Sequence, residues 1–304
     1  MTKIKINRKN LMEKLKKVIS FCSGTLLGNS EYLIFRDDQL LIYTGDLLCR
    51  VYLDEKINLN KSIPYYNFIN FLEKGKEDFI YIEVEENSLL MNCGRISSKI
   101  RLMDLRDAFD AKEIGNFKDF DKIIKIDDSF LEALSFLSST SNKNSSGYPI
   151  LNTVHFKNDV IECSNNFVIC KYKTTYSFKE VCISSSSLVK ISKLKMLKEM
   201  GFSEHWVVFK GDDIEIFCCC YEGDYPDLSG FCNELEGDLI KFPSNLIEVI
   251  ERTNSFRFHL SNEDDVLMFI LGQRLKIRKE GEEGWIEEQC PIKYDGEPLT
   301  FSMS

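Results

Sequence analysis

The 304-residue chain has few of the side chains that enzymes most often use for catalysis. Its only histidines are His155, His205 and His259, and each lies in a strand-like segment, where a lone histidine is usually structural. The sequence contains no HExxH, GxSxG, GxxxxGKS, GxxxxGKT or GxGxxG motif. Acid pairs such as Asp37 and Asp38 fall at predicted hairpin tips, where aspartate favours the turn itself. We therefore expect a protein that is not an enzyme and that uses no metal or cofactor.

Long apolar runs and CxxC motifs are also missing from the sequence. No apolar run approaches the roughly 20 residues that a transmembrane helix needs, and residues 1–6 lack the apolar core of a signal peptide. The 11 cysteines include no CxxC pair, and Cys218, Cys219 and Cys220 would alternate between the faces of a strand. We expect reduced thiols that act as small apolar residues. These features predict a soluble, cytoplasmic protein with no membrane contact.

The formal net charge of the chain is −9, because 48 acids outnumber 39 lysines and arginines. Taken alone, this acidity argues against a nucleic-acid partner. Net charge is a poor guide, however, where basic residues are segregated onto one surface of a fold. The distribution of lysines among the predicted helices therefore matters more than the total.

Five segments of the chain share one order of predicted elements, namely a short strand, a helix and several alternating strands. Alternation of apolar and polar residues is typical of half-buried antiparallel strands. The helices are predicted at residues 8–19, 64–74, 127–139, from 186 onward, and 243–253. Hairpin turns are predicted at residues 36–39, 157–159 and 210–213. A repeat of about 60 residues predicts an α+β fold built from tandem β-α-βββ units.

A short turn-forming motif separates the fourth unit from the fifth. Residues 220–228 read CYEGDYPDL, and the motif consists of Gly223, Asp224, Tyr225, Pro226 and Asp227. Paired β-α-βββ units in domains strung head to tail are the architecture of DNA polymerase sliding clamps. The motif resembles the link between the second and third domains of bacterial beta clamps, with Leu228 where an aromatic residue is more usual. Residues 40–53 and 240–261 are similar to segments of the first and third clamp domains.

The resemblance implies three clamp domains at residues 1–118, 119–230 and 231–304. The third would hold only its first half, because residues 294–304 look like the lead-in strand of a sixth unit. Residues 163–168 correspond to a turn of the family's partner-peptide pocket but lack its glycine and arginine. This divergence is compatible with a phage-encoded clamp.

The resemblance also implies a function. In the family, helices line a central channel, and antiparallel sheets form the outside. The chain would be a non-catalytic processivity factor that encircles double-stranded DNA without sequence preference and tethers the replicative polymerase. A DNA polymerase and a clamp loader would be its partners. Two copies would close a head-to-tail homodimer ring through the first and third domains.

Two predicted helices have the charge that such a channel needs. In the first, five basic residues accompany one acid, and apolar residues occupy the opposite face at helical spacing. The fourth has Leu188 and Ile191 on one side and lysines on the other. The predicted channel-lining residues, which would act on DNA phosphates, are Arg8, Lys9, Lys16, Lys17, Lys190 and Lys193.

Other interpretations stay open. The third and fifth helices carry acids, and any lysine-rich helix face is often only a solvated surface. A β-rich interaction scaffold with a clamp-like fold but no DNA role is therefore the main alternative. A two-domain trimeric clamp fits less well, because each such protomer has four units and this chain has five.

Overall fold

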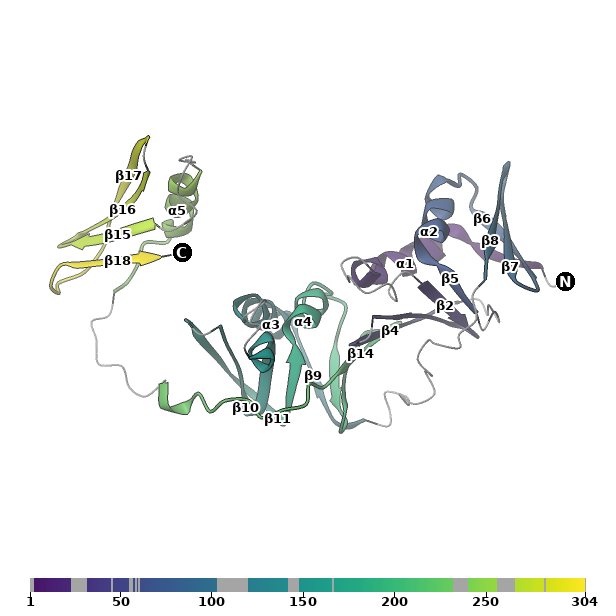
Figure 1. Ribbon diagram of the computed structural model, residues 1–304, viewed down its shortest axis with the longest axis horizontal. Coiled ribbons are helices and arrows are strands. Elements are labelled where there is room, and N and C mark those ends of the chain that lie inside the picture. The colour runs from purple at the N-terminus through teal and green to yellow at the C-terminus, as the bar shows by residue number, and fades with distance from the viewer. Residues whose placement is uncertain are drawn as a thin grey trace. The chain divides into compact units, whose positions relative to one another are not determined.

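The computed structural model describes residues 3–22, 32–44, 46–54, 57, 59, 61–102, 120–141, 148–165, 167–231, 240–255, 266–281 and 283–303. Two compact units make up the chain, Met1–Asp227 and Leu228–Ser304 (Figure 1). The division falls directly after the GDYPD motif. The three domains expected from the sequence stay a prediction, and the two compact units are described separately below.

The first half of the larger unit contains two β-α-βββ repeats that exchange their first strands. Strand β1 pairs with β6 of the second repeat, and β5 pairs with β2 of the first, so neither repeat completes its sheet alone. The elements are β1 (Lys3–Asn7), α1 (Arg8–Cys22), β2 (Tyr32–Arg36), β3 (Gln39–Tyr43), β4 (Leu47–Tyr52), β5 (Lys61–Pro64), α2 (Tyr65–Lys74), β6 (Phe79–Glu85), β7 (Ser88–Cys93) and β8 (Ile96–Arg101).

The second half repeats this plan. Its elements are β9 (Asp121–Lys125), α3 (Asp128–Thr140), β10 (Thr153–Ser164), β11 (Ile169–Ser184), α4 (Ser185–Ile191), β12 (Glu199–Phe202), β13 (Trp206–Lys210) and β14 (Ile214–Cys219), with a short 3-10 turn at Pro149–Asn152; a second 3-10 turn, Ser229–Phe231, belongs to the smaller unit. The hairpin predicted at residues 157–159 is supported within the segment assigned to β10: Asn158 has a φ of 53°, the value of Asp37 in the β2–β3 turn, and His155 Nδ1 lies 3.0 Å from Glu162, which is seven residues further on and out of reach in a straight strand. The chain turns again at Asn165, whose side chain accepts hydrogen bonds from the backbone N–H groups of Phe167 and Val168.

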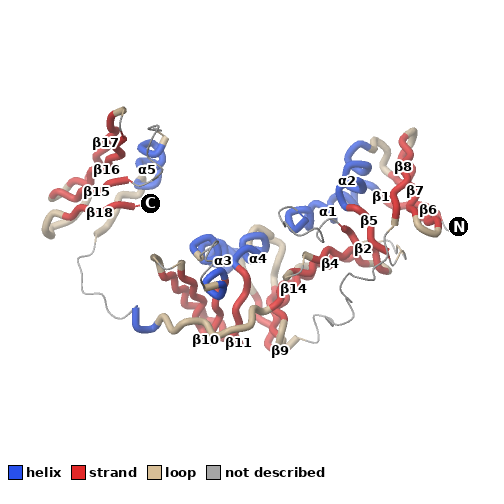
Figure 2. Tube along the Cα trace, viewed as in Figure 1, coloured by secondary structure: helices blue, strands red, loops and turns tan. Residues whose placement is uncertain are grey.

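One eight-stranded antiparallel sheet connects the two halves, in the order β5-β2-β3-β4-β14-β13-β12-β9. Its central pair is β4 and β14, which run from Ile214 opposite Val51 to Cys218 opposite Leu47. Helices α1 to α4 lie on one side of the sheets of this unit (Figure 2). Leu15 of α1, Leu188 of α4 and the strand residue Phe209 are fully buried in one shared core. The other sheet face carries a smaller apolar cluster that includes Leu48, Phe120 and Phe217.

Local sequence signals explain where the helices begin. Asp127 caps α3 by accepting a hydrogen bond from the Phe130 backbone N–H at 2.9 Å. Pro64 stands directly before α2, which agrees with the preference of proline for helix starts. Helix α4 is shorter than predicted and ends at Ile191, because the chain then turns through residues 192–193 toward β12. Lys193 therefore follows the helix rather than lying on its face.

The smaller unit has its own core and sheet. Its elements are α5 (Leu246–Asn254), β15 (Val266–Leu271), β16 (Arg274–Gly281), β17 (Gly284–Pro291) and β18 (Leu299–Met303), in the sheet order β17-β16-β15-β18. Buried Val249 of α5 packs with Met268, Ile270 and Ile277 of the strands. Pro243 was expected in the first helical turn but precedes it, and its carbonyl accepts from the Leu246 N–H at 3.1 Å. Strand β18 pairs with β15 as β5 pairs with β2, so the predicted lead-in strand is present.

Candidate nucleic-acid interface

Helix α1 presents two faces to different surroundings. Leu11 and Leu15 are buried against the sheets, as their helical spacing predicts. Lys9 and Lys16 are exposed on the side away from the core. Lys16 forms no ion pair with any residue in the described part of the chain. Two of the six predicted lining residues therefore lie on the solvent side of α1.

Arg8 is half-buried, and its guanidinium is bound to backbone carbonyls of the protein. Its Nε donates to the Glu77 carbonyl at 2.7 Å, and its Nη1 donates to the Leu72 carbonyl at 2.8 Å. The second bond satisfies one of the last carbonyls of α2, which have no partner within the helix. Arg8 therefore fixes α1 against the end of α2, and its charge favours the negative end of the α2 dipole.

Lys9 forms a surface ion pair with Asp78, with 2.8 Å between Nζ and Oδ1. The hydrogen bond from Lys9 lowers the pKa of the Asp78 carboxyl. Both side chains are more than 60% exposed, so water and salt screen the pair and it can exchange for other partners.

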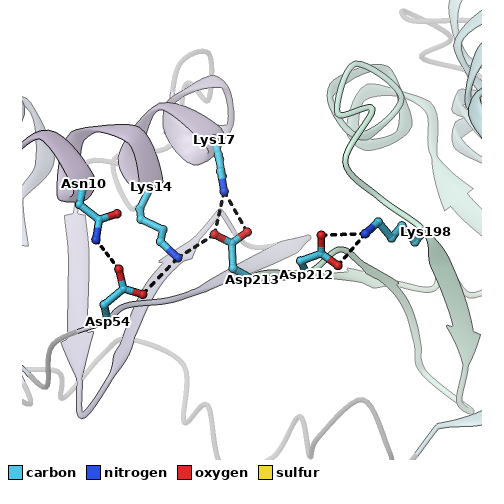
Figure 3. Close-up of polar contacts among 7 residues, drawn as sticks. All are labelled: Asn10, Lys14, Lys17, Asp54, Lys198, Asp212 and Asp213. Carbon is cyan, nitrogen blue, oxygen red and sulfur yellow. Dashed lines mark hydrogen bonds and ion pairs between the residues drawn. The ribbon is translucent and has the colours of Figure 1, made fainter.

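Lys17 and its neighbour Lys14 contact the tip of the β13–β14 hairpin (Figure 3). Lys17 Nζ lies 2.9 and 2.7 Å from the two carboxylate oxygens of Asp213, and Lys14 Nζ lies 2.7 Å from one of them. Burial alone would raise the pKa of Asp213, but the two lysines outweigh it, and the pKa is lowered. Lys14 also lies 3.8 Å from Asp54, which accepts a hydrogen bond from Asn10.

The same hairpin tip binds a third lysine from the other side. Both oxygens of Asp212 lie 2.7 Å from Lys198 Nζ (Figure 3). Lys198 stands just before β12, so the tip connects α1 with the start of that strand. Of the lysines predicted on the fourth helix, Lys190 is half-buried on α4 and Lys193 is exposed beyond it. Of the six predicted residues, only Lys17 contacts this tip, where Lys14 and Lys198 also bind.

A buried ion pair joins β4 to β14 on the opposite sheet face. Arg50 Nη1 lies 3.0 Å from Glu215 Oε2, and each residue is only 4% exposed. The Tyr52 hydroxyl donates to the same carboxylate at 3.1 Å, and the Arg50 guanidinium lies over the Phe217 ring. Because each charge is removed from water, its partner is needed to offset the desolvation cost. The pair therefore fixes the register in which β4 and β14 meet.

This pair continues a row of alternating charges across the sheet. Directly opposed residues on β9, β12, β13, β14 and β4 are Lys125, Glu199, Lys210, Glu215 and Arg50. Opposite charges at facing positions stabilise neighbouring strands, and like charges destabilise them. A slip of β14 along β4 would break this alternation, so the row adds to the register.

The GDYPD motif packs against β10 and β11 instead of extending freely. The Tyr225 ring stacks on the His155 ring, with centroids 4.7 Å apart and an interplanar angle of 19°. The two His155 nitrogens face Glu162 at 3.0 Å and Glu180 at 3.3 Å. The hydrogen bond from His155 lowers the pKa of Glu162, and burial raises the pKa of Tyr225.

A polar cavity of about 410 Å³ lies beside this stack and is lined by Glu180, His205, Tyr221 and Asp224, among others. Gly223 has a φ of 139°, a conformation that other residues rarely adopt. The remaining motif residues Asp224, Pro226 and Asp227 are exposed. The motif therefore leaves the larger unit from a docked position on its surface.

The described cysteines are free thiols, and most of them are buried. Burial raises the pKa of Cys163 to about 12 and that of Cys182 to about 11, so these thiols stay protonated and unreactive at neutral pH. In the described ranges, no group of three or more His, Cys, Asp or Glu side chains could hold a metal ion. Among the described helices, none combines the length and apolar character of a membrane span.

The residues that sequence reasoning missed are those whose partners lie far along the chain. Lys14 and Lys17 are visible at helical spacing, but nothing local points to Asp213, 196 residues beyond Lys17. Arg50 and Glu215 give a clearer signal, because each is a single charge inside an otherwise apolar strand. Lone opposite charges in two such strands could have suggested their pairing.

Solved structures of bacterial sliding clamps have the same fold as this chain. The DNA polymerase sliding clamp of Bacillus subtilis superposes with a TM-score of 0.81 at 17% identity, over 99% of this chain and 87% of that one. The DNA polymerase III beta subunit of Pseudomonas aeruginosa gives 0.79 at 16% identity, with the same coverage. The beta chain of Streptococcus pneumoniae gives 0.79 at 18% identity, also over 99% and 87%. No protein-family model and no curated protein matches the sequence.

These likenesses confirm the clamp fold expected from the repeat and the GDYPD motif. The predicted α+β architecture of tandem units with antiparallel sheets is present across nearly the whole chain. At such low sequence identity, the likeness establishes the fold alone.

Proposed function

We propose that the chain is a sliding clamp that encircles double-stranded DNA and tethers a DNA polymerase, without catalysing a reaction itself. One observation carries the proposal, namely a clamp fold along almost the entire chain. The exposed lysines on and beside the helices support it, because a sliding protein needs positive charge that contacts phosphates without reading bases. By the same resemblance, a clamp loader is a second proposed partner.

Reversal of three exposed charges tests the DNA contact. In the variant K9E/K16E/K193E, we expect retention on circular duplex DNA at about 0.1 M salt to fall by about tenfold or more, with a weaker dependence on salt. The matched control K3E/K173E/K179E reverses three exposed lysines on strands β1 and β11, away from the helices and from the edge strands β8 and β17. Equal retention of wild type and both variants would contradict the proposal that Lys9, Lys16 and Lys193 contact DNA.

We further propose that two copies close a ring head to tail through β8 and β17. Both are edge strands of their sheets. β8 carries Lys99 and Arg101, whereas β17 carries Glu287 and Glu288. The two edges thus have opposite charges, as the joined strands β4 and β14 do at Arg50 and Glu215. Edge strands with free backbone groups readily pair with another chain.

A charge swap tests this closure. We expect K99E/R101E and E287K/E288K each to be monomeric, because like charges would face each other at both contacts of a ring. An equimolar mixture should restore the dimer, since each contact then joins opposite charges. The mass in solution, measured by light scattering, gives the answer. A mixture that stays monomeric, or single variants that remain dimeric, would contradict pairing through these edges.

The interaction scaffold is the second candidate function. The neutralisation of Lys14 and Lys17 by Asp213 favours it, because it removes positive charge from the helix side of the fold. A scaffold predicts the same weak retention on DNA for wild type and for K9E/K16E/K193E. The retention assay therefore separates the two functions.

A further inference from the structure

The Asp212–Asp213 tip is held in place by its backbone. The Gly211 N–H donates to the Ile214 carbonyl at 2.9 Å, which closes a tight turn around the two aspartates. A Cβ on Gly211 would lie 2.8 Å from the Met196 carbonyl oxygen, so only glycine fits without a shift. The Lys198 N–H donates to the Lys210 carbonyl at 2.8 Å on the adjoining strand. The carboxylates are therefore presented at a fixed position, independently of the lysines that they bind.

The charges around the tip cancel. Lys14, Lys17 and Lys198 contribute three positive charges, and Asp54, Asp212 and Asp213 contribute three negative ones. The lysine side chains on α1 are only 14% and 21% exposed, whereas that of Lys198 is 61% exposed. The cluster thus contains three lysines but has little net charge.

Carboxylate and phosphate oxygens accept hydrogen bonds from the same ammonium donors. An aspartate that holds a lysine therefore competes directly with a DNA phosphate for it. Lys14 and Lys17 lie on the same helix as Lys9 and Lys16, which the proposed function places beside DNA. Each lysine that leaves its aspartate for a phosphate adds to the affinity for DNA and to its salt dependence. Competition from the aspartates therefore keeps the affinity low, which suits a clamp that must slide.

We propose that Lys14, Lys17 and Lys198 form a binding site for DNA backbone phosphates, and that Asp212 and Asp213 occupy it as phosphate substitutes. The tip limits the affinity of the resting protein for DNA. This inference rests on the proposed function and adds a site to it.

Neutralising the tip tests the inference. D212N/D213N keeps the shape of both side chains but removes their charge. We expect it to bind a short linear duplex more tightly than wild type, by about tenfold at 0.1 M salt for each additional phosphate that a released lysine binds. The slope of log K against log salt should steepen by about 0.9 for each such lysine. Fluorescence anisotropy at several salt concentrations measures both quantities.

The chain provides a matched control in its other acidic hairpin tip. D37N/D38N causes the same change in net charge at the β2–β3 turn, where the structure shows no ion pair between either aspartate and another described residue. Only the D212N/D213N variant should show the steeper slope. Equal slopes for the two variants would overturn the phosphate site, because the change in net charge alone would then explain the stronger binding.

A second set of variants separates this inference from the proposed function. K14Q/K17Q/K198Q in the D212N/D213N background should return affinity and slope to about the wild-type values. If wild type binds DNA but D212N/D213N binds it no more tightly, the site is wrong and the clamp proposal stands. If wild type shows no salt-dependent binding at all, both are wrong. Should the double variant fail to fold, D212N alone frees only Lys198, and a slope unchanged from wild type would overturn the site.

Discussion

Two sets of charges hold the joint between β4 and β14, and they differ in their access to water. Arg50 and Glu215 lie on one face of the sheet and are almost completely buried. On the helix side, Asp213 binds Lys14 and Lys17 in a half-buried cluster, and Lys198 with Asp212 lies largely in solvent. Buried charges cannot exchange partners without a large cost, whereas exposed ones can. The joint is thus fixed on one side and electrostatically adjustable on the other.

The largest expected effect comes from breaking the buried pair. Glu215→Ala leaves the Arg50 guanidinium buried without its carboxylate, and we expect the free energy of unfolding to fall by about 3–5 kcal/mol. Urea denaturation measures the change. The control R50M/E215L removes both charges at similar volume and should lose much less. An equal loss in both variants would show that packing, not the unpaired charge, sets the cost.

An intermediate effect is expected at Asp213, and it depends on pH. The pKa of Asp213 is lowered in the folded protein, so its ion pairs stabilise the fold above the ordinary carboxyl value of 3.8, and this contribution disappears as the pH falls through the lowered pKa. Asp213→Asn should therefore cost about 1 kcal/mol or less at pH 7. The difference from wild type should vanish in strong acid. A difference that stays constant from pH 7 to pH 2 would exclude the ion pairs as its source.

The smallest effect on stability is expected at Asp212. Its side chain is 80% exposed and that of Lys198 is 61% exposed, so Asp212→Asn should leave the unfolding midpoint in urea nearly unchanged. A clear loss of stability would show that the outer pair supports the joint like the buried one. The same variant should still steepen the salt dependence of DNA binding, which separates a role in binding from a role in stability.

Much of the fold could be predicted because its signals are local. Helices α1, α2 and α3 follow from apolar spacing and from residues such as Pro64 and Asp127 at their starts. The turns around Asp37 and Asp212 also occur where sequence predicts them. The turn at residues 157–159 is of the same kind, because Asn158 has the positive φ of 53° that Asp37 has in the β2–β3 turn.

The candidate site was harder to predict because it is made by contacts distant in the sequence. The lysines of α1 were recognised as a basic face, but Lys17 and Arg8 turn out to have partners within the protein. Those partners lie on a hairpin and a helix end that only the folded sheet brings near α1. Charge patterning along one helix therefore indicates the chemistry of a surface but not which of its charges are already satisfied.

The pairing of β4 with β14 has a consequence for synthesis of the protein. Arg50 and Glu215 are 165 residues apart, so β4 leaves the ribosome long before its neighbour exists. Until then the inner edge of β4 is an open template for other strands, although its apolar residues are ready to form a sheet. Contacts at such separation also slow folding. Aggregation of the nascent chain is thus expected to start at β4, and a chaperone that covers this strand would protect the whole molecule.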